Sequence, residues 1–156
     1  MRAAPHLRRV HAGSTSCPTP TSLLKPPLPQ DNFDLLVIPG GAKGAETMAS
    51  SSPVQHFVRE YLERGKFVGM ICAGSMAALT SGLPKQPLTS HPSVRDYLKE
   101  DFEYSEDPVV VSGTLVTSRG PGTAFPFALT LVELLCGAKK RGEVAASMVF
   151  PLGTFA

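Results

Sequence analysis

Cys72 is the residue in this sequence whose surroundings most favour chemistry. The stretch VGMICAGSMAA (residues 68–78) runs from an apolar segment through Cys72 into a series of very small residues. Residues 66–71 are expected to form a strand and residues 73–82 a helix that begins without a loop. Cys72 then lies on the sharp turn between them, and the small residues behind it let the helix start close to the sheet. This placement projects the thiol into a cleft.

Two features of such a turn suit a nucleophilic thiolate. The N-terminus of a helix favours negative charge, and its first backbone amides can donate to a bound oxyanion. Gly40 and Gly41 end the preceding apolar run and add further amide donors that no side chain obstructs, which predicts an oxyanion site for a carbonyl substrate. A second interpretation stays open on spacing alone, because most free cysteines are simply small buried hydrophobic residues.

The whole-chain composition predicts one soluble globular domain, since 42% of the 156 residues are hydrophobic and 18% are charged. A net charge of +2 gives no reason to expect nucleic acid, and no apolar run reaches the ~18 residues that a membrane span needs. The three cysteines, Cys17, Cys72 and Cys136, are odd in number and widely spaced, which fits neither a disulfide framework nor a metal cluster. We expect a reducing compartment, no metal, and packing as the role of Cys136.

Strands and helices alternate along the chain. The pattern predicts strands at 34–38 and 66–71, a glycine-rich turn after the first, and a hairpin over 108–118. Helices are predicted at 52–65, with Ser52 as N-cap, at 73–82, within 88–100, and in a long apolar segment ending at Gly137. This order is typical of an α/β doubly wound domain, with a mostly parallel sheet, helices on both faces, and ligands at the carboxyl ends of the strands.

Three regions are expected. Residues 1–30 hold 6 of the 15 prolines, four basic residues and no acidic one, which predicts a disordered tail. Residues 31–150 form the folded domain, and 151–156 a short C-terminal tail. A basic, acid-free N-terminus is also typical of mitochondrial transit peptides, so a mitochondrial location stands beside the cytoplasmic one that we expect.

Four segments, DLLVIPGG, ICAGSMAAL, TSHP and TSRGPGTAF, occur in the order found in the ThiJ/PfpI (DJ-one/PfpI) superfamily. The chain resembles the branch of parkinsonism-associated deglycases and glutathione-independent glyoxalases. The resemblance implies a flavodoxin-like sheet of the class I glutamine amidotransferase type. It also implies roles for particular residues: Cys72 as nucleophile, Gly41 and Ala73 as oxyanion-hole amides, His91 beside the thiol, and Arg119, Gly120 and Pro121 in the loop bordering the pocket.

The function implied by this resemblance is cofactor-free conversion of methylglyoxal to D-lactate, or the related protein deglycase activity, in a homodimer that takes a small dicarbonyl substrate. A non-catalytic redox sensor or chaperone, in which Cys72 is oxidised to the sulfinate, is an alternative. A pseudoenzyme is another.

One departure from the family bears on activity. The family places a strand, a helix and at least one further strand ahead of DLLVIPGG, and these carry a glutamate that hydrogen-bonds the cysteine. Residues 1–30 contain no Asp or Glu, and the resemblance gives Glu46 no catalytic role. We therefore expect an N-terminally truncated member with an unpaired edge at strand 34–38 and activity lowered ~10²- to 10⁴-fold. His91 has proton transfer or capping as alternative roles, and Arg119 has substrate contact or an ordinary ion pair.

Overall fold

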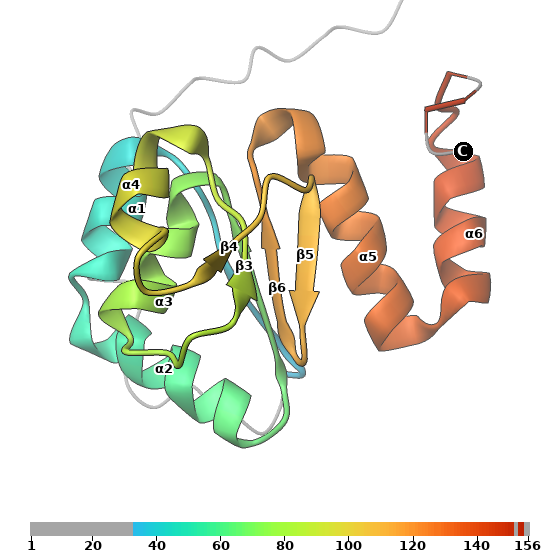
Figure 1. Cartoon of the computed structure of the whole chain (residues 1–156). Helices are drawn as coiled ribbons and strands as arrows, with labels where there is room; N and C mark the ends of the chain where they lie inside the picture. The colour runs from blue at the N-terminus through green and yellow to red at the C-terminus, as the bar shows by residue number, and fades with distance from the viewer. Residues whose placement is uncertain (1–32, 152, 155–156) are drawn as a thin grey trace, which may run out of the picture.

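The computed structural model describes residues 33–151 and 153–154 of the chain. Its centre is a four-stranded sheet in the order β1-β2-β6-β5, in which β1, β2 and β6 run parallel and β5 is antiparallel to β6 (Figure 1). The strands are β1 (Leu35–Ile38), β2 (Phe67–Ile71), β5 (Val109–Ser112) and β6 (Leu115–Ser118). The predicted α/β fold class, mostly parallel with helices on both faces, is confirmed.

β1 is a continuous apolar strand because both of its faces meet helices. Leu36 and Ile38 pack into the core on one side of the sheet, and Leu35 packs into the core on the other. Within the described residues β1 is an edge strand paired only with β2, as the sequence predicted, and Val37 is 44% exposed there.

One face of the sheet is covered by α1 (Ala42–Ala49), α2 (Ser52–Glu63), α3 (Met76–Thr80) and α4 (Arg95–Leu98) (Figure 1). A two-stranded parallel sheet of β3 (Pro87–Leu88) and β4 (Glu103–Tyr104) completes this side. Val58, Met70 and Leu98 are fully buried in the large core beneath these helices. This layer supplies the segments that surround Cys72.

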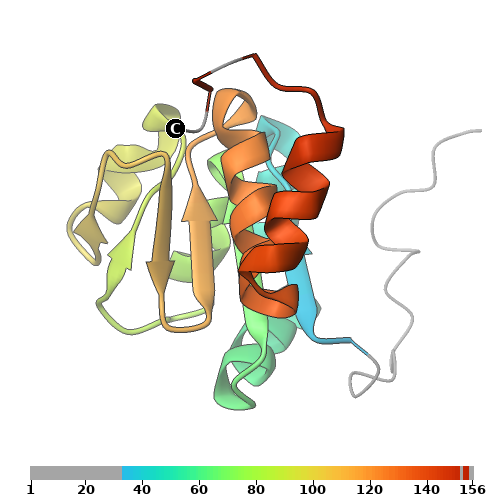
Figure 2. The same cartoon turned by 90° about the vertical axis from the view of Figure 1, so that its right-hand side faces the viewer.

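The opposite face carries α5 (Ala124–Cys136) and α6 (Ala138–Ser147), which lie side by side (Figure 2). Phe127 and Leu131 of α5 pack on the centre of the sheet at Gly69 of β2. A Cβ at Gly69 would lie 2.9 Å from the Phe127 ring, so the glycine lets α5 approach the sheet closely.

Several predicted elements are confirmed with small shifts. The hairpin turns at Gly113–Thr114, where Gly113 has a φ of 57° that suits glycine, and α5 ends before Gly137. The helix expected from residue 73 is instead a 3₁₀ turn at Cys72–Ser75 followed by the short α3. The N-cap of α2 is Ser51 rather than Ser52, because the helix begins one residue earlier than Pro53 suggested.

Three expectations are wrong. The glycine-rich stretch after β1 is not only a turn, since α1 begins directly after Gly41. The apolar helix that ends at Gly137 was expected to be the last helix of the chain, but a further helix, α6, follows Gly137 immediately. Cys136 is exposed rather than packed, since it lies in the last turn of α5. The predicted tail at 1–30, including Cys17, lies outside the described residues.

Candidate functional site

The turn that carries Cys72 is strained. Cys72 has a φ of +64°, a conformation that costs a non-glycine residue energy and that persists where the surrounding fold imposes it. It directly follows β2 and opens the 3₁₀ turn, so it lies at the carboxyl end of a central strand. Its side chain is half-buried. A partly accessible thiol on such a turn is available to react with a small molecule.

Glycines bring the loop after β1 against this turn. A Cβ at Gly40 would lie 2.5 Å from Cys72 Cβ and 3.1 Å from its Sγ, and a Cβ at Gly74 would lie 2.6 Å from the carbonyl oxygen of Pro39. Gly41 has a φ of +92° and caps α1. Of the predicted neighbours, Gly40 therefore lies against Cys72, Gly41 follows it in the same loop, and Ala73 follows Cys72 in the turn.

His91 lies beside the turn, held through its backbone and its ring. Its amide donates to the Cys72 carbonyl at 3.2 Å, and a Cβ at Gly120 would lie 3.4 Å from its Cδ2. Its Nδ1 accepts from the Ser93 amide at 3.2 Å and lies 2.8 Å from Ser93 Oγ. Since Nδ1 is the acceptor, the neutral ring carries its proton on Nε2. Capping, the second role expected of His91, is thus present in the structure.

Arg119 makes the ion pair that the sequence left open as an alternative. Its Nη2 lies 2.6 Å from Glu106 Oε2, and its Nη1 donates to the Glu106 carbonyl at 3.0 Å. Arg95 reaches the other carboxylate oxygen of Glu106 at 3.1 Å. Glu106 therefore ties the end of β6 to the segment that follows His91. Substrate contact by Arg119 stays a prediction.

The loop that begins at Gly120 and Pro121 is closed by hydroxyl groups. Thr123 Oγ1 lies 2.7 Å from Ser118 Oγ and accepts from the Gly120 amide at 3.0 Å. Pro121 opens a short 3₁₀ turn and is exposed. The loop lies on the His91 side of the site, since Gly120 is next to the His91 ring.

Buried hydroxyl groups connect the segments around the site by hydrogen bonds. Ser75 Oγ donates to the Thr89 carbonyl at 2.9 Å, and the Thr89 amide donates to Thr117 Oγ1 at 2.9 Å. All three residues are fully buried. This network joins the Cys72 turn, the segment ahead of His91 and β6. Sequence reasoning missed Ser75, Ser93 and Glu106 because serines and surface glutamates in loops give no periodic signal.

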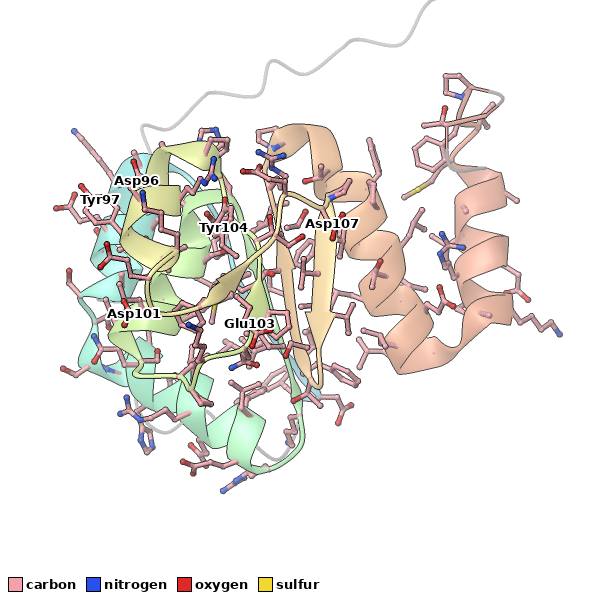
Figure 3. All side chains as sticks on the ribbon, viewed as in Figure 1. Asp96, Tyr97, Asp101, Glu103, Tyr104 and Asp107 are labelled. Atoms are coloured by element: carbon pink, nitrogen blue, oxygen red, sulfur yellow. The ribbon has the colours of Figure 1, made fainter. Side chains whose placement is uncertain are left out.

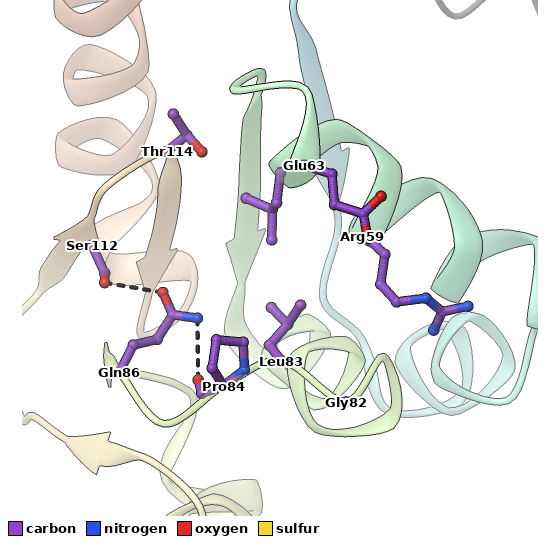
Figure 4. A pocket seen from close by; sticks show the side chains of 9 residues that line it. Arg59, Glu63, Gly82, Leu83, Pro84, Gln86, Ser112 and Thr114 are labelled. Atoms are coloured by element: carbon purple, nitrogen blue, oxygen red, sulfur yellow. Dashed lines mark hydrogen bonds between the residues drawn. The ribbon is translucent and has the colours of Figure 1, made fainter.

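Two hollows among the described residues are of similar size, and one of them adjoins the site. It is a groove of about 380 Å³ between α1, α3 and α4 whose lining includes Ala73 and Ser93. The other, of about 400 Å³, lies beside α2 and the start of β6, where the Gln86 amide donates to the Pro84 carbonyl and its oxygen accepts from Ser112 (Figure 4). The slightly larger hollow is therefore remote from the candidate chemistry.

The α4–β5 region is rich in acidic side chains, which Figure 3 labels together with two tyrosines. These carboxylates have local partners, such as Asp96 with Lys99 and Asp107 with Ser105. Within residues 33–151 and 153–154, no group of three His, Cys, Asp or Glu side chains is placed to hold a metal ion. In the same part of the chain, no helix has the length and apolar character needed to cross a bilayer.

The protein is thus of the α/β class, with a strained cysteine at the end of a central strand, Gly40 against the thiol and a histidine beside the turn. The model of the DJ-1/PfpI family matches residues 21–134. The chain belongs to the DJ-1/PfpI family.

Named relatives agree with this assignment. The chain is 44% identical over 121 residues to "Glutathione-independent glyoxalase DJ-1" of Schizosaccharomyces pombe, covering 76% of this chain and 63% of that protein. It is 37% identical over 113 residues to "Glutathione-independent glyoxalase DJR-1.2" of Caenorhabditis elegans, covering 72% of this chain and 60% of that protein. The solved structure of Schizosaccharomyces pombe DJ-1 matches with a TM-score of 0.74 and 43% identity, over 78% of this chain and 65% of that one. The chain thus spans less than two thirds of these relatives.

Proposed function

We propose that this protein is a glutathione-independent glyoxalase that uses Cys72 as its nucleophile, with methylglyoxal as substrate and D-lactate as product. The observation that carries the proposal is the strained, half-buried Cys72 facing Gly40 at the end of β2. Two relatives carry the name glutathione-independent glyoxalase, which supports the same chemistry.

The reaction needs no external oxidant or reductant. The Cys72 thiolate adds to the aldehyde carbon, and the aldehyde oxygen takes up a proton to give a hemithioacetal. A base removes the hydrogen of that carbon as a proton, and the former ketone oxygen takes up a proton to give an enediol. A proton is then added to the second carbon while the hydroxyl on the first carbon loses its proton and becomes the thioester carbonyl. The resulting thioester is hydrolysed by water, which releases the 2-hydroxy acid and restores the thiol.

His91 and the amides of Gly41 and Ala73 have assigned roles in this proposal. The amides stabilise the oxyanion that forms when the thiolate adds. Because Ser93 holds His91 Nδ1, Nε2 is the ring nitrogen left to exchange a proton with the substrate. In the present tautomer Nε2 donates to a substrate oxygen, and it serves as a base only after the ring changes tautomer. This constraint is one reason to expect slow turnover.

The direct test measures methylglyoxal consumption and lactate formation without glutathione by the full 156-residue chain. Cys72→Ala should abolish turnover, whereas Cys136→Ala, a change at an exposed thiol on α5, should leave it unchanged. Folded wild-type protein without turnover would contradict the proposal. Peroxide-treated protein that gains two oxygen atoms at Cys72 would then favour the redox-sensor alternative.

Assembly and location are further parts of the proposal. We propose that the protein is a homodimer and that it is located in the cytoplasm. The homodimer is supported by the exposed apolar side chains of Phe125, Leu134 and Leu135 on α5, which suit a protein contact. Sedimentation of the purified chain measures the assembly, and a monomer across the micromolar range would contradict this part.

A further inference from the structure

The groove beside the candidate site has a size and chemistry of its own. It runs between α1, α3 and α4, and its volume of about 380 Å³ equals roughly a dozen water molecules. The methyl group of methylglyoxal would leave most of this space unfilled. The groove is lined by Ala42, Ala45, Glu46, Ala49, Ser50, Ala73, Met76, Thr80, Ser93, Val94 and Tyr97.

The groove borders the candidate chemistry through Ala73 and Ser93, and Cys72 itself is not among its lining residues. Ala73 directly follows Cys72, and Ser93 is the residue whose hydroxyl and amide hold His91 Nδ1. From there the groove extends along α1 and α4, toward Ala49 on one wall and Tyr97 on the other. A molecule whose aldehyde carbon reaches Cys72 can therefore direct its substituent into this space.

The lining selects for a neutral, apolar group. Alanines, Met76, Val94 and the 65% exposed ring of Tyr97 provide most of the surface, and Figure 3 shows Tyr97 standing on α4. Glu46 is the single charged side chain in the lining, and no basic residue lines the groove. A substituent that bears a carboxylate would meet Glu46 without a compensating cation, which disfavours it.

We propose that this groove is the subsite for the substituent of an α-oxoaldehyde substrate and that it takes a neutral aryl or branched alkyl group. This inference rests on the proposed function, since it assumes that Cys72 reacts with the aldehyde. It names a substrate class, the α-oxoaldehydes with a bulky apolar substituent, that is turned over in preference to methylglyoxal.

The first experiment compares kcat/KM for methylglyoxal, phenylglyoxal and 4-carboxyphenylglyoxal. Wild-type protein should favour phenylglyoxal over methylglyoxal by about tenfold, the effect of filling an apolar pocket. Thr80→Trp, at an exposed groove position on α3, should lower kcat/KM for phenylglyoxal at least ~5-fold more than kcat/KM for methylglyoxal. Equal use of both aldehydes, unaffected by Thr80→Trp, would overturn the subsite.

Glu46→Gln tests the charge selection at nearly constant shape. It should raise kcat/KM for 4-carboxyphenylglyoxal relative to that for phenylglyoxal by about 3- to 10-fold, because removal of one partly solvated like charge relieves about a kcal/mol. A uniform change for all three aldehydes would contradict the assigned role of Glu46.

Binding without turnover separates this inference from the proposed function. The probe is 4-fluorophenylglyoxal, followed by fluorine NMR with Cys72→Ala protein and with the Cys72→Ala, Thr80→Trp double variant. Broadening of the probe signal that the double variant loses would support the groove even where no wild-type turnover is found. Methylglyoxal turnover without such broadening would leave the glyoxalase proposal standing and overturn the subsite. Absence of both would overturn both.

Discussion

Gly40 and Cys72 lie so close that no side chain fits between them. A Cβ at position 40 would be 2.5 Å from Cys72 Cβ, a separation that real Cβ atoms essentially never show, and 3.1 Å from Cys72 Sγ. A side chain at position 40 would therefore displace the loop after β1, the turn after β2, or both. Because position 40 has no side chain, the Cys72 thiol lies against the backbone of Gly40.

Gly40→Ala is expected to damage the site and the fold together. The added methyl group forces apart two backbone segments, so the free energy of unfolding should fall by about 1–3 kcal/mol. Because the displaced part is the Cys72 turn, the rate of thiol modification by a small alkylating reagent should change as well. Urea unfolding and timed alkylation followed by mass spectrometry measure the two effects.

Gly44→Ala is the matched control for that substitution. Gly44 lies in the first turn of α1, and nothing lies within 4 Å of a Cβ built there. Alanine is the better helix former by about 0.5–1 kcal/mol, so this variant should be as stable as wild type or more so. Equal losses in both variants would mean that the close contact with Cys72 is not the cause.

Much of the fold could be predicted from apolar patterning. The continuous apolar run at 34–38 predicted a strand, and the small residues after Cys72 predicted a sharp turn at the end of a strand. The prediction failed where short-range signals conflicted. Gly40, Gly41 and Gly44 suggested a turn, although only the first two lie outside α1.

The partners in the site could not be predicted, because they are set by tertiary contacts. Glu106 is 13 residues from Arg119 and 11 from Arg95, and no helical or strand period links them. Ser93 looked like an ordinary residue after a proline, yet it fixes which nitrogen of His91 is an acceptor. Local sequence specifies neither pairing, since each depends on where β6 and α4 are packed.

The buried hydrogen bond from Ser75 to Thr89 yields a prediction about stability. Ser75→Ala removes the donor and leaves the fully buried carbonyl of Thr89 without it, which should cost about 1–3 kcal/mol. Ser147→Ala is the matched control, because the Ser147 hydroxyl donates to the Val144 carbonyl at an exposed position. Urea unfolding measures the free energy of unfolding of both variants. A loss of stability in Ser147→Ala alone would contradict the prediction.

The carboxylate of Glu106 bridges Arg95 and Arg119 at a half-exposed position, so its contribution should be small and sensitive to salt. Glu106→Gln is expected to lower the free energy of unfolding by about 0.2–1 kcal/mol. The difference should shrink toward zero in ~1 M salt, where screening acts within a few ångströms. Paired unfolding curves at low and high salt measure this. A difference that stayed the same at high salt would show that shape, rather than charge, matters at this position.

Burial of Tyr61 makes a prediction about alkaline pH. Its side chain is 6% exposed, and burial, followed by the negative charge of Glu60, raises the pKa of its hydroxyl above the ordinary value. The unfolded chain ionises at the ordinary value, about 10, whereas the folded chain resists ionisation. The stability that this difference supports is therefore complete below about pH 10 and is lost as the pH rises toward the folded pKa, with a slope of at most ~1.4 kcal/mol per pH unit.

Tyr61→Phe removes the titrating group and keeps the ring. Between about pH 9 and about pH 11 the variant should therefore lose less stability than wild type, with the two curves converging in slope at lower pH. Tyr97→Phe, at a ring that is 65% exposed, should follow the wild-type curve throughout. Urea unfolding at a series of pH values gives all three curves. If the Tyr61→Phe curve fell in parallel with wild type up to pH 11, the alkaline loss would have to come from groups other than Tyr61.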